Sequence, residues 1–169
     1  MATREILVMG DERLREKSKP IDVKTIKSKE IQNLIKDLRD IAKLNTEDEG
    51  LITVGLSAVQ MGILQRVFVV ISDVNSRKGA KFEVYINPEI DVESTQMISG
   101  IESCLSTPGI CGEVSRYDSV KVTYYDEKGK KKKEKFSGEK AVFIQHEEDH
   151  LDGILWIDRV TDTKTISYC

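Results

Sequence analysis

The sequence contains few of the residues that bind metals or form cross-links, with two histidines and three cysteines among 169 residues. It also has only one tryptophan. The odd number of cysteines, at positions 104, 111 and 169, argues against a disulfide framework and favours a reducing compartment. No apolar run approaches the roughly 20 residues that span a bilayer, and the N-terminus lacks the charged-then-apolar pattern of a secretory signal. We therefore expect a cytoplasmic protein without a membrane partner.

A strong excess of one charge is also missing. The net charge is −3 and the pI is about 5.6, so nothing draws the whole chain toward DNA or an anionic membrane. One basic run, from Lys130 to Lys133, is expected to cap a solvated hairpin, because Glu127 and Glu134 flank it. The alternative is contact with ribosomal RNA or another polyanion; contact with ribosomal RNA would allow a transient association with the ribosome.

Hydrophobic periodicity predicts an α+β fold. Apolar residues from Ile31 to Ala42 recur at helical spacing, which predicts an amphipathic helix over residues 29–44 with its apolar stripe in the core. Short runs rich in β-branched residues, or alternating in polarity, predict strands at residues 6–9, 54–59, 67–72, 82–90 and 119–125. With 39% hydrophobic residues, the chain suits a single domain over residues 1–169. We expect mainly antiparallel sheets packed around a central helix.

That central helix should contain both histidines, in the segment His146-Glu147-Glu148-Asp149-His150. Residues i and i+4 lie on one helix face, so both imidazoles can reach a single cation at roughly 2.0–2.1 Å. Glu147 would lie beside the ion, where it could accept a proton from a water that the ion acidifies. The H-E-x-x-H pattern thus indicates a metallohydrolase. Ser137 is the expected N-cap of this helix, and Gly153 is expected to end it.

Two histidines leave the usual three-ligand catalytic site incomplete. Cys, Asp or Glu must supply the third ligand, because no histidine remains. Downstream of His150 the only carboxylates are Asp152, Asp158 and Asp162, whereas a thiol is available upstream at Cys104. The residues alone leave these alternatives open.

Three segments together resemble the motifs of the peptide deformylase family, in the family's order. Thr53 to Gln60 is similar to its G-x-G-L-A-A-x-Q motif, Glu102 to Ser106 to E-G-C-L-S, and Gln145 to Gly153 to Q-H-E-x-D-H-L-x-G. The similarity spans nearly the whole chain, to about Val160. It implies a single peptide-deformylase-like catalytic domain over residues 1–169.

The resemblance also implies a role for each matching residue. Cys104, His146 and His150 would bind one divalent metal ion, with Fe(II) the expected native ion and Zn, Ni or Co alternatives in purified protein. Glu147 would act as the general acid and base, and Gln60 with the backbone N–H of Leu105 would stabilise the oxyanion. An ion pair between Glu102 and Arg116 would fix the loop that contains Cys104.

The implied substrate is an N-formylated nascent polypeptide, from whose first methionine the formyl group is removed as formate. An extended peptide would pair with backbone near Val54, Gly55 and Ser103, while Val142 and Phe143 would line the methionine pocket. Phe143 looks bulky for that pocket. A metallopeptidase and an inactive deformylase-like binding protein are the alternatives. Comparing turnover of a formylated peptide with that of an acetylated or unblocked peptide would distinguish a deformylase from a metallopeptidase, and a binding protein would show no turnover.

Four positions depart from the family pattern. Thr53 and Ser103 replace glycine, Ser57 replaces alanine, and Cys111 replaces an arginine that contacts substrate in many members. Since each residue implied to bind the metal or act as base is present, we expect the chemistry to persist with altered efficiency or specificity.

Overall fold

The computed structural model describes residues 5–47, 54–73 and 81–169. Two α-helices, α1 (Lys29–Glu47) and α2 (Glu139–Leu151), occur in this part of the chain. Its strands are β1 (Gly55–Ser57), β2 (Val67–Ile71), β3 (Phe82–Val92), β4 (Met97–Ser103), β5 (Ile110–Tyr117), β6 (Ser119–Tyr125), β7 (Lys131–Ser137) and β8 (Ser167–Tyr168). None of the helices described is long and apolar enough to cross a membrane.

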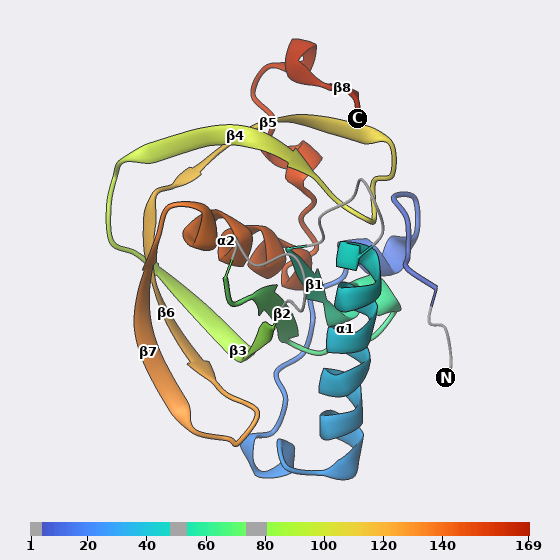
Figure 1. Ribbon diagram of the computed structural model, residues 1–169, viewed down its shortest axis with the longest axis vertical. Coiled ribbons are helices and arrows are strands. Elements are labelled where there is room, and N and C mark those ends of the chain that lie inside the picture. Colours follow the sequence, from blue (N-terminus) through green and yellow to red (C-terminus); the bar gives the residue numbers. More distant parts are fainter. Residues whose placement is uncertain (1–4, 48–53, 74–80) are drawn as a thin grey trace.

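The strands form two antiparallel sheets, which confirms a mixed helix and strand fold with antiparallel pairing. In the first sheet the strand order is β1-β2-β3-β6-β7, and in the second it is β4-β5-β8. Helix α2 lies between β4 and β5 on one side and β2 and β3 on the other (Figure 1). It contacts strands of both sheets. The helix that contains both histidines is therefore in contact with both sheets.

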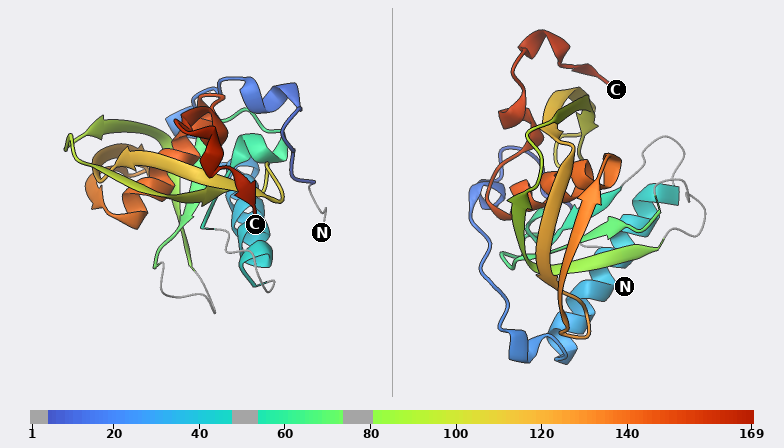
Figure 2. Two further views of the ribbon diagram at one scale, coloured as in Figure 1. Left: turned by 90° about the horizontal axis from the view of Figure 1, so that it is seen from above. Right: turned by 90° about the vertical axis from the view of Figure 1, so that its left-hand side faces the viewer.

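Strand β2 shows how the first sheet is buried on both faces. Its sequence, Val67-Phe68-Val69-Val70-Ile71, is buried throughout. Side chains alternate across a strand, so Val67, Val69 and Ile71 join the core cluster that includes α1, whereas Phe68 and Val70 join the cluster that includes α2. The two helices accordingly cover opposite faces of this sheet (Figure 2, right).

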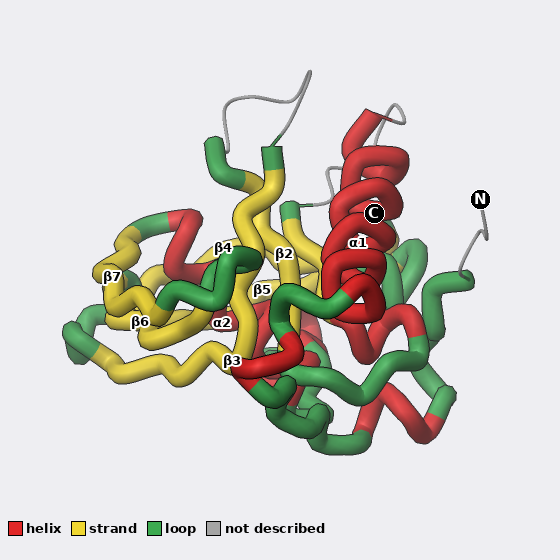
Figure 3. Tube along the Cα trace, turned by 90° about the horizontal axis from the view of Figure 1, so that it is seen from below, coloured by secondary structure: helices red, strands yellow, loops and turns green. Residues whose placement is uncertain are grey.

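Helix α1 packs through the stripe predicted from its sequence. Ile31, Leu34, Ile35, Leu38 and Ala42 are all buried in the first cluster, so the stripe is core as expected. Figure 3 shows α1 standing beside the strands of the first sheet. The helix is longer than predicted, because it continues beyond residue 44 to Glu47.

Helix α2 begins and ends close to the predicted positions. Its N-cap is Gly138, so the prediction of Ser137 is wrong: Ser137 is still paired with Ser119 in the β6–β7 ladder. After Leu151 the chain turns at Gly153, which has a φ of +75°. A Cβ atom there would lie 2.4 Å from the carbonyl oxygen of Arg15, so only glycine fits this contact with the N-terminal segment.

The predicted hairpin exists, and its turn includes the first lysine of the basic run, Lys130. Asp126 Oδ1 accepts hydrogen bonds from the N–H groups of Lys128 and Lys130, which closes the turn between β6 and β7. Residues 131–133 belong to β7 itself. Lys130 therefore lies at the turn, whereas Lys131 to Lys133 extend along the strand.

Two other strand predictions need correction. Residues 6–9 form no strand; Leu7 and Met9 instead donate single hydrogen bonds to the carbonyl oxygens of Gln60 and Ser106, and neither acceptor residue belongs to a strand. The strand expected at 54–59 is shorter, since the chain turns into a 3-10 helix at Ala58–Met61. The remaining predicted strands, β2, β3 and β6, are confirmed.

Candidate active site

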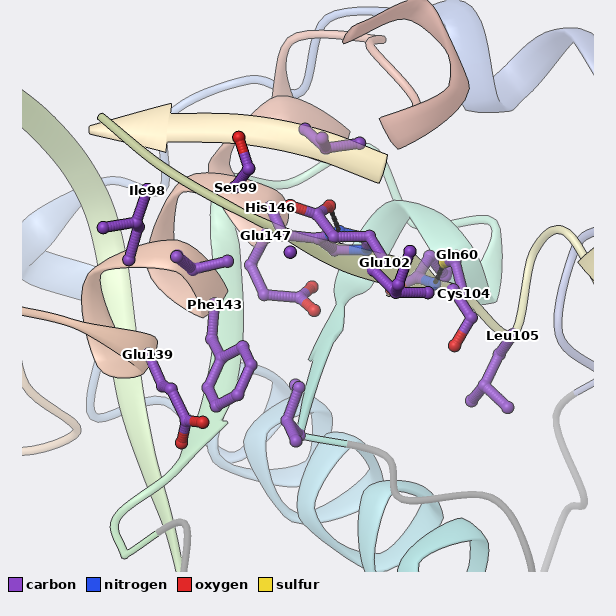
Figure 4. A pocket seen from close by; sticks show the side chains of 17 residues that line it. Gln60, Ile98, Ser99, Glu102, Cys104, Leu105, Glu139, Phe143, His146 and Glu147 are labelled. Atoms are coloured by element: carbon purple, nitrogen blue, oxygen red, sulfur yellow. Dashed lines mark hydrogen bonds and ion pairs between the residues drawn. The ribbon is translucent and has the colours of Figure 1, made fainter. Parts of the chain in front are cut away.

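A cavity of about 420 Å³ opens between β4, the start of β1 and helix α2. Strand β4 contributes a continuous wall from Ile98 to Ser103, and α2 contributes the opposite side (Figure 4). Val54 and Gly55 line it at the start of β1. One edge of each sheet thus borders the same space.

The sequence of α2 divides this helix into a core face and a cavity face. Ala141, Ile144 and Leu151 are buried in the second core cluster. Glu139, Val142, Phe143, His146 and Glu147 line the cavity, at spacings of three, four and seven residues that bring them to one side of a helix. Helical periodicity therefore places one predicted metal ligand, His146, and the predicted base, Glu147, on the same side of the helix as the two predicted pocket residues.

Three potential metal ligands converge at one end of the cavity. Cys104 directly follows β4, while His146 and His150 project from α2 one turn apart. Their ligand atoms all lie within 4.8 Å of one another, and Cys104 Sγ lies 3.3 Å from His150 Nε2. Ligand atoms around a tetrahedral ion are separated by roughly 3.3–3.7 Å. One thiolate and two imidazoles in this arrangement fit a divalent transition-metal ion.

The charges in this cluster favour the ligand form of the thiol. Burial alone would raise the pKa of Cys104, but the neighbouring His150 and His146 hold it well below its ordinary value. The pKa of His146 is raised well above its ordinary value, because the effects of Cys104 and Glu102 exceed that of burial. The cysteine is therefore a thiolate when it meets a metal ion.

A chain of buried charges orients His146. Glu102 Oε2 lies 2.7 Å from His146 Nδ1, and the same carboxylate accepts two hydrogen bonds from Arg116, at 2.8 and 2.9 Å. This confirms the predicted ion pair of Glu102 with Arg116. Arg116 also reaches Asp149 at 2.5 Å, and Arg159 donates to Asp149 in turn. The contact at Nδ1 leaves His146 Nε2 for the metal.

Gln60 is fixed with its amide nitrogen toward the cluster. Its Oε1 accepts a hydrogen bond from the backbone N–H of Ser57 at 2.9 Å, while its Nε2 lies 3.3 Å from Cys104 Sγ and 3.1 Å from Ser106 Oγ. In the part of the chain that the structure describes, the N–H of Leu105 has no hydrogen-bond partner. The two donors that lie near the thiolate are Gln60 Nε2 and the backbone N–H of Ser106, which is 3.4 Å from Cys104 Sγ.

Glu147 is almost fully buried beside the two imidazoles. Burial raises the pKa of its carboxyl above the ordinary value, against the opposing effect of His146 and His150. Strand β1 approaches it closely: a Cβ atom on Gly55 would lie 2.5 Å from Glu147 Oε1. Glycine at position 55 thus leaves the space that this carboxylate occupies.

Comparison with known proteins identifies the family. The family model described as polypeptide deformylase matches residues 3–165. The chain is 40% identical to peptide deformylase of Thermomicrobium roseum, covering 99% of this chain and 92% of the relative, and 39% identical to peptide deformylase 2 of Xanthomonas campestris, covering 97% and 91%. A crystal structure of a peptide deformylase from Legionella pneumophila superposes with a TM-score of 0.81 at 35% identity, covering 96% of this chain and 88% of the other.

The chain belongs to the polypeptide deformylase family. The resemblance seen in the sequence motifs is therefore confirmed. Of the residues expected to bind the metal, take part in catalysis or contact substrate, all except His150 line the cavity, and His150 Nε2 lies 3.3 Å from Cys104 Sγ. Sequence reasoning missed Ile98 to Ile101, Val114 and Glu139. Glu139 could have been found, since it precedes His146 by seven residues on one helix face.

The departures from the deformylase pattern lie in different places. Ser103 lines the cavity at the end of β4. Cys111 does not line it; this residue is buried on β5, opposite Ser167 of β8, and all three cysteines are free thiols. Thr53 lies outside the described residues. Ser57 is fully buried next to Glu147.

The ion pairs of Glu102 predict a specific dependence of stability on pH. Burial would raise the pKa of Glu102, but Arg116 and His146 lower it from 4.5 to about 2. A lowered pKa stabilises the fold above the unfolded-state value, and this contribution, about 3 kcal/mol, disappears as the pH falls from about 4.5 to about 2. Urea unfolding of the Glu102→Gln variant should accordingly show a large loss of stability at neutral pH and a progressively smaller one in acid.

The exposed pair of Lys36 and Asp40 on α1 supplies a control. Asp40→Asn should change the free energy of unfolding much less, because solvent screens this pair. A stability difference between wild type and Glu102→Gln that stays constant across this pH range would contradict the assignment.

Proposed function

We propose that residues 1–169 form one catalytic domain that removes the formyl group from the N-terminal methionine of new polypeptides, with release of formate. Membership of the deformylase family makes the chain a metal-dependent hydrolase of N-formylated polypeptides. The observation that supports the assignment of residues is the convergence of Cys104, His146 and His150 beside the buried Glu147, at one end of a cavity large enough for a side chain.

Cys104, His146 and His150 would hold the metal ion in this proposal. We infer Fe(II) as the native ion, with Zn, Ni or Co as substitutes in purified protein, because thiolate and imidazole ligands suit all four. When bound, the ion would lower the pKa of a water molecule toward about 7 and polarise the formyl carbonyl.

The protein's own residues would then move one proton and stabilise one developing charge. Glu147 accepts a proton from the attacking water, whose oxygen forms the new bond to the formyl carbon. Gln60 Nε2 and the N–H of Leu105 donate to the carbonyl oxygen as it becomes negative. The C–N bond breaks, Glu147 returns the proton to the departing amine, and formate leaves.

Two free strand edges offer a peptide-binding site in this arrangement. Strand β4 is an edge of the second sheet as described, and β1 is an edge of the first. An extended peptide could pair with backbone at Val54, Gly55 and Ser103, and main-chain bonding of this kind tolerates many sequences. Val142 and Phe143 would receive the methionine side chain. Helix α2 would then be the central helix of the fold, and the edge strands of both sheets beside it would bind the substrate.

We further propose that the enzyme acts in the cytoplasm, on chains leaving the ribosome, without DNA or a membrane as partner. The acidic balance of the chain supports the exclusion of polyanions. Along β7, Lys133 lies within 4.0 Å of Asp91 on β3, and Lys135 lies within 4.0 Å of Glu93, which directly follows β3. Because these lysines are partly neutralised, contact with ribosomal RNA would be transient.

The reaction predicts a sharp selectivity for the acyl group. A formyl carbon has only hydrogen on its far side, whereas a peptidase must accommodate a whole residue there. Purified protein loaded anaerobically with Fe(II) should release formate from formyl-Met-Ala and release nothing from acetyl-Met-Ala or unblocked Met-Ala-Ser. Cleavage of the unblocked peptide would indicate a metallopeptidase, and no turnover of any peptide would indicate a binding protein.

Metal binding and proton transfer should separate by mutation. Cys104→Ala, His146→Ala and His150→Ala each remove one of three ligands, so each should abolish stoichiometric metal binding. Glu147→Gln should retain the metal and lose at least about 10² in kcat, because only the base is removed. Elemental analysis and formate release measure the two effects. Full metal content in Cys104→Ala, or near-normal turnover in Glu147→Gln, would refute the respective role.

Phe143 should limit the side chain that the cavity accepts. Its ring is half-buried on the cavity face of α2 and also packs against the second core cluster. Phe143→Cys should therefore raise the ratio of kcat/KM for formyl-Met over formyl-Ala peptides by about tenfold or more, since one methylene of contact is worth roughly 1–3 kcal/mol. Strong preference for Met in the wild type, unchanged by the substitution, would show that Phe143 does not shape the pocket.

A further inference from the structure

The hydroxyl of Ser57 lies within hydrogen-bond distance of two oxygens of Glu147, a contact that an alanine could not make. The side chain is fully buried at the end of β1. Its Oγ lies 2.7 Å from Glu147 Oε2 and 2.9 Å from the backbone oxygen of the same residue. The family pattern has alanine at this position, so the hydroxyl is a feature of this chain and not of the motif.

The two oxygens of the Glu147 carboxylate consequently have different surroundings. Oε2 accepts the hydrogen bond from Ser57, while Oε1 lies against the open side of Gly55, where a Cβ would come within 2.5 Å. Both Gly55 and Glu147 line the cavity. The hydrogen bond from Ser57 thus engages Oε2, and Oε1 is the oxygen that remains for a reacting water.

Ser57 also connects Glu147 to Gln60, whose amide nitrogen lies near the Cys104 thiolate. Its backbone N–H donates to Gln60 Oε1 at 2.9 Å while its side chain donates to Glu147. A single residue of β1 therefore orients both the carboxylate and the amide. Because a hydroxyl carries one proton, the backbone oxygen of Glu147 is the alternative acceptor whenever the bond to Oε2 weakens.

We propose that Ser57 is a positioning residue that fixes the orientation of the Glu147 carboxylate for proton transfer. This inference rests on the proposed function, in which Glu147 is the general acid and base. A glutamate side chain has several rotatable bonds, and a hydrogen bond to an ionised group restricts them more strongly than a neutral one. The hydroxyl should therefore increase turnover and leave substrate binding unaffected.

The kinetic test uses Ser57→Ala with Ser119→Ala as its control. Ser119 is a buried serine on β6 whose hydroxyl has no partner among the described residues. Ser57→Ala should lower kcat about tenfold with KM and metal content unchanged, as expected for loss of one hydrogen bond to a charged group. Ser119→Ala should leave kcat unchanged. An unaltered kcat in Ser57→Ala, or an equal fall in Ser119→Ala, would overturn the proposal.

A second measurement needs no turnover. In metal-free protein, Ser57→Ala should lower the urea midpoint of unfolding more in the wild-type background than in Glu147→Ala, because the second background lacks the acceptor carboxylate. Equal shifts in both backgrounds would show that the two side chains are not coupled, and would overturn the proposal. If the wild type released no formate, the proposed function would fail, and this cycle would still test the contact.

Discussion

The candidate site depends on the buried ion pairs of Arg116. This residue of β5 is only 5% exposed and bonds both Glu102 on β4 and Asp149 on α2. Glu102 is two residues from Cys104, and Asp149 is next to His150, so one guanidinium ties the sheet that positions the thiolate to the helix that positions the imidazoles. Removing one partner of such a pair leaves an uncompensated buried charge, which typically costs 3–5 kcal/mol. The ligand geometry and the stability of the fold are therefore maintained by the same contacts.

Helix α2 combines two requirements that would conflict in a uniformly apolar helix. One face completes the core against Phe68 and Val70 of β2, and the other lines the cavity with ionisable groups. The glycines near it have a related purpose. Gly55 lets β1 approach the carboxylate of Glu147, and Gly153 lets the segment after the helix pass the backbone of Arg15. Close packing at Gly55 helps to keep the Glu147 side chain buried at the edge of the cavity.

The sequence predicted these features unequally, for physical reasons. The spacing of apolar residues was sufficient to predict α1, β2 and β6, because each of these elements is buried on one face or on both faces. The spacing of four residues was sufficient to place the two histidines on one side of a helix. Strands β4 and β5 contain glycine and serine, and β4 is mostly exposed, so neither shows a hydrophobic pattern. The third ligand could not be chosen from the residues alone. In the structure Asp152 pairs with Arg66, Asp158 pairs with Arg15, and Asp162 caps a 3-10 helix, so these carboxylates are engaged elsewhere. Long-range contacts of this kind leave no local signature.

The free edge of β4 has a consequence for the behaviour of the protein in solution. An unpaired row of backbone donors and acceptors binds any extended chain, whether substrate or a second copy of the protein. Ile101 is 68% exposed and Met97 45% exposed on this strand, which adds apolar surface to an open template. In the proposed mode of peptide binding, tolerance of many nascent sequences and resistance to self-association thus make opposite demands on the same seven residues. Crowded, substrate-free conditions are where edge-to-edge aggregation of this enzyme would begin.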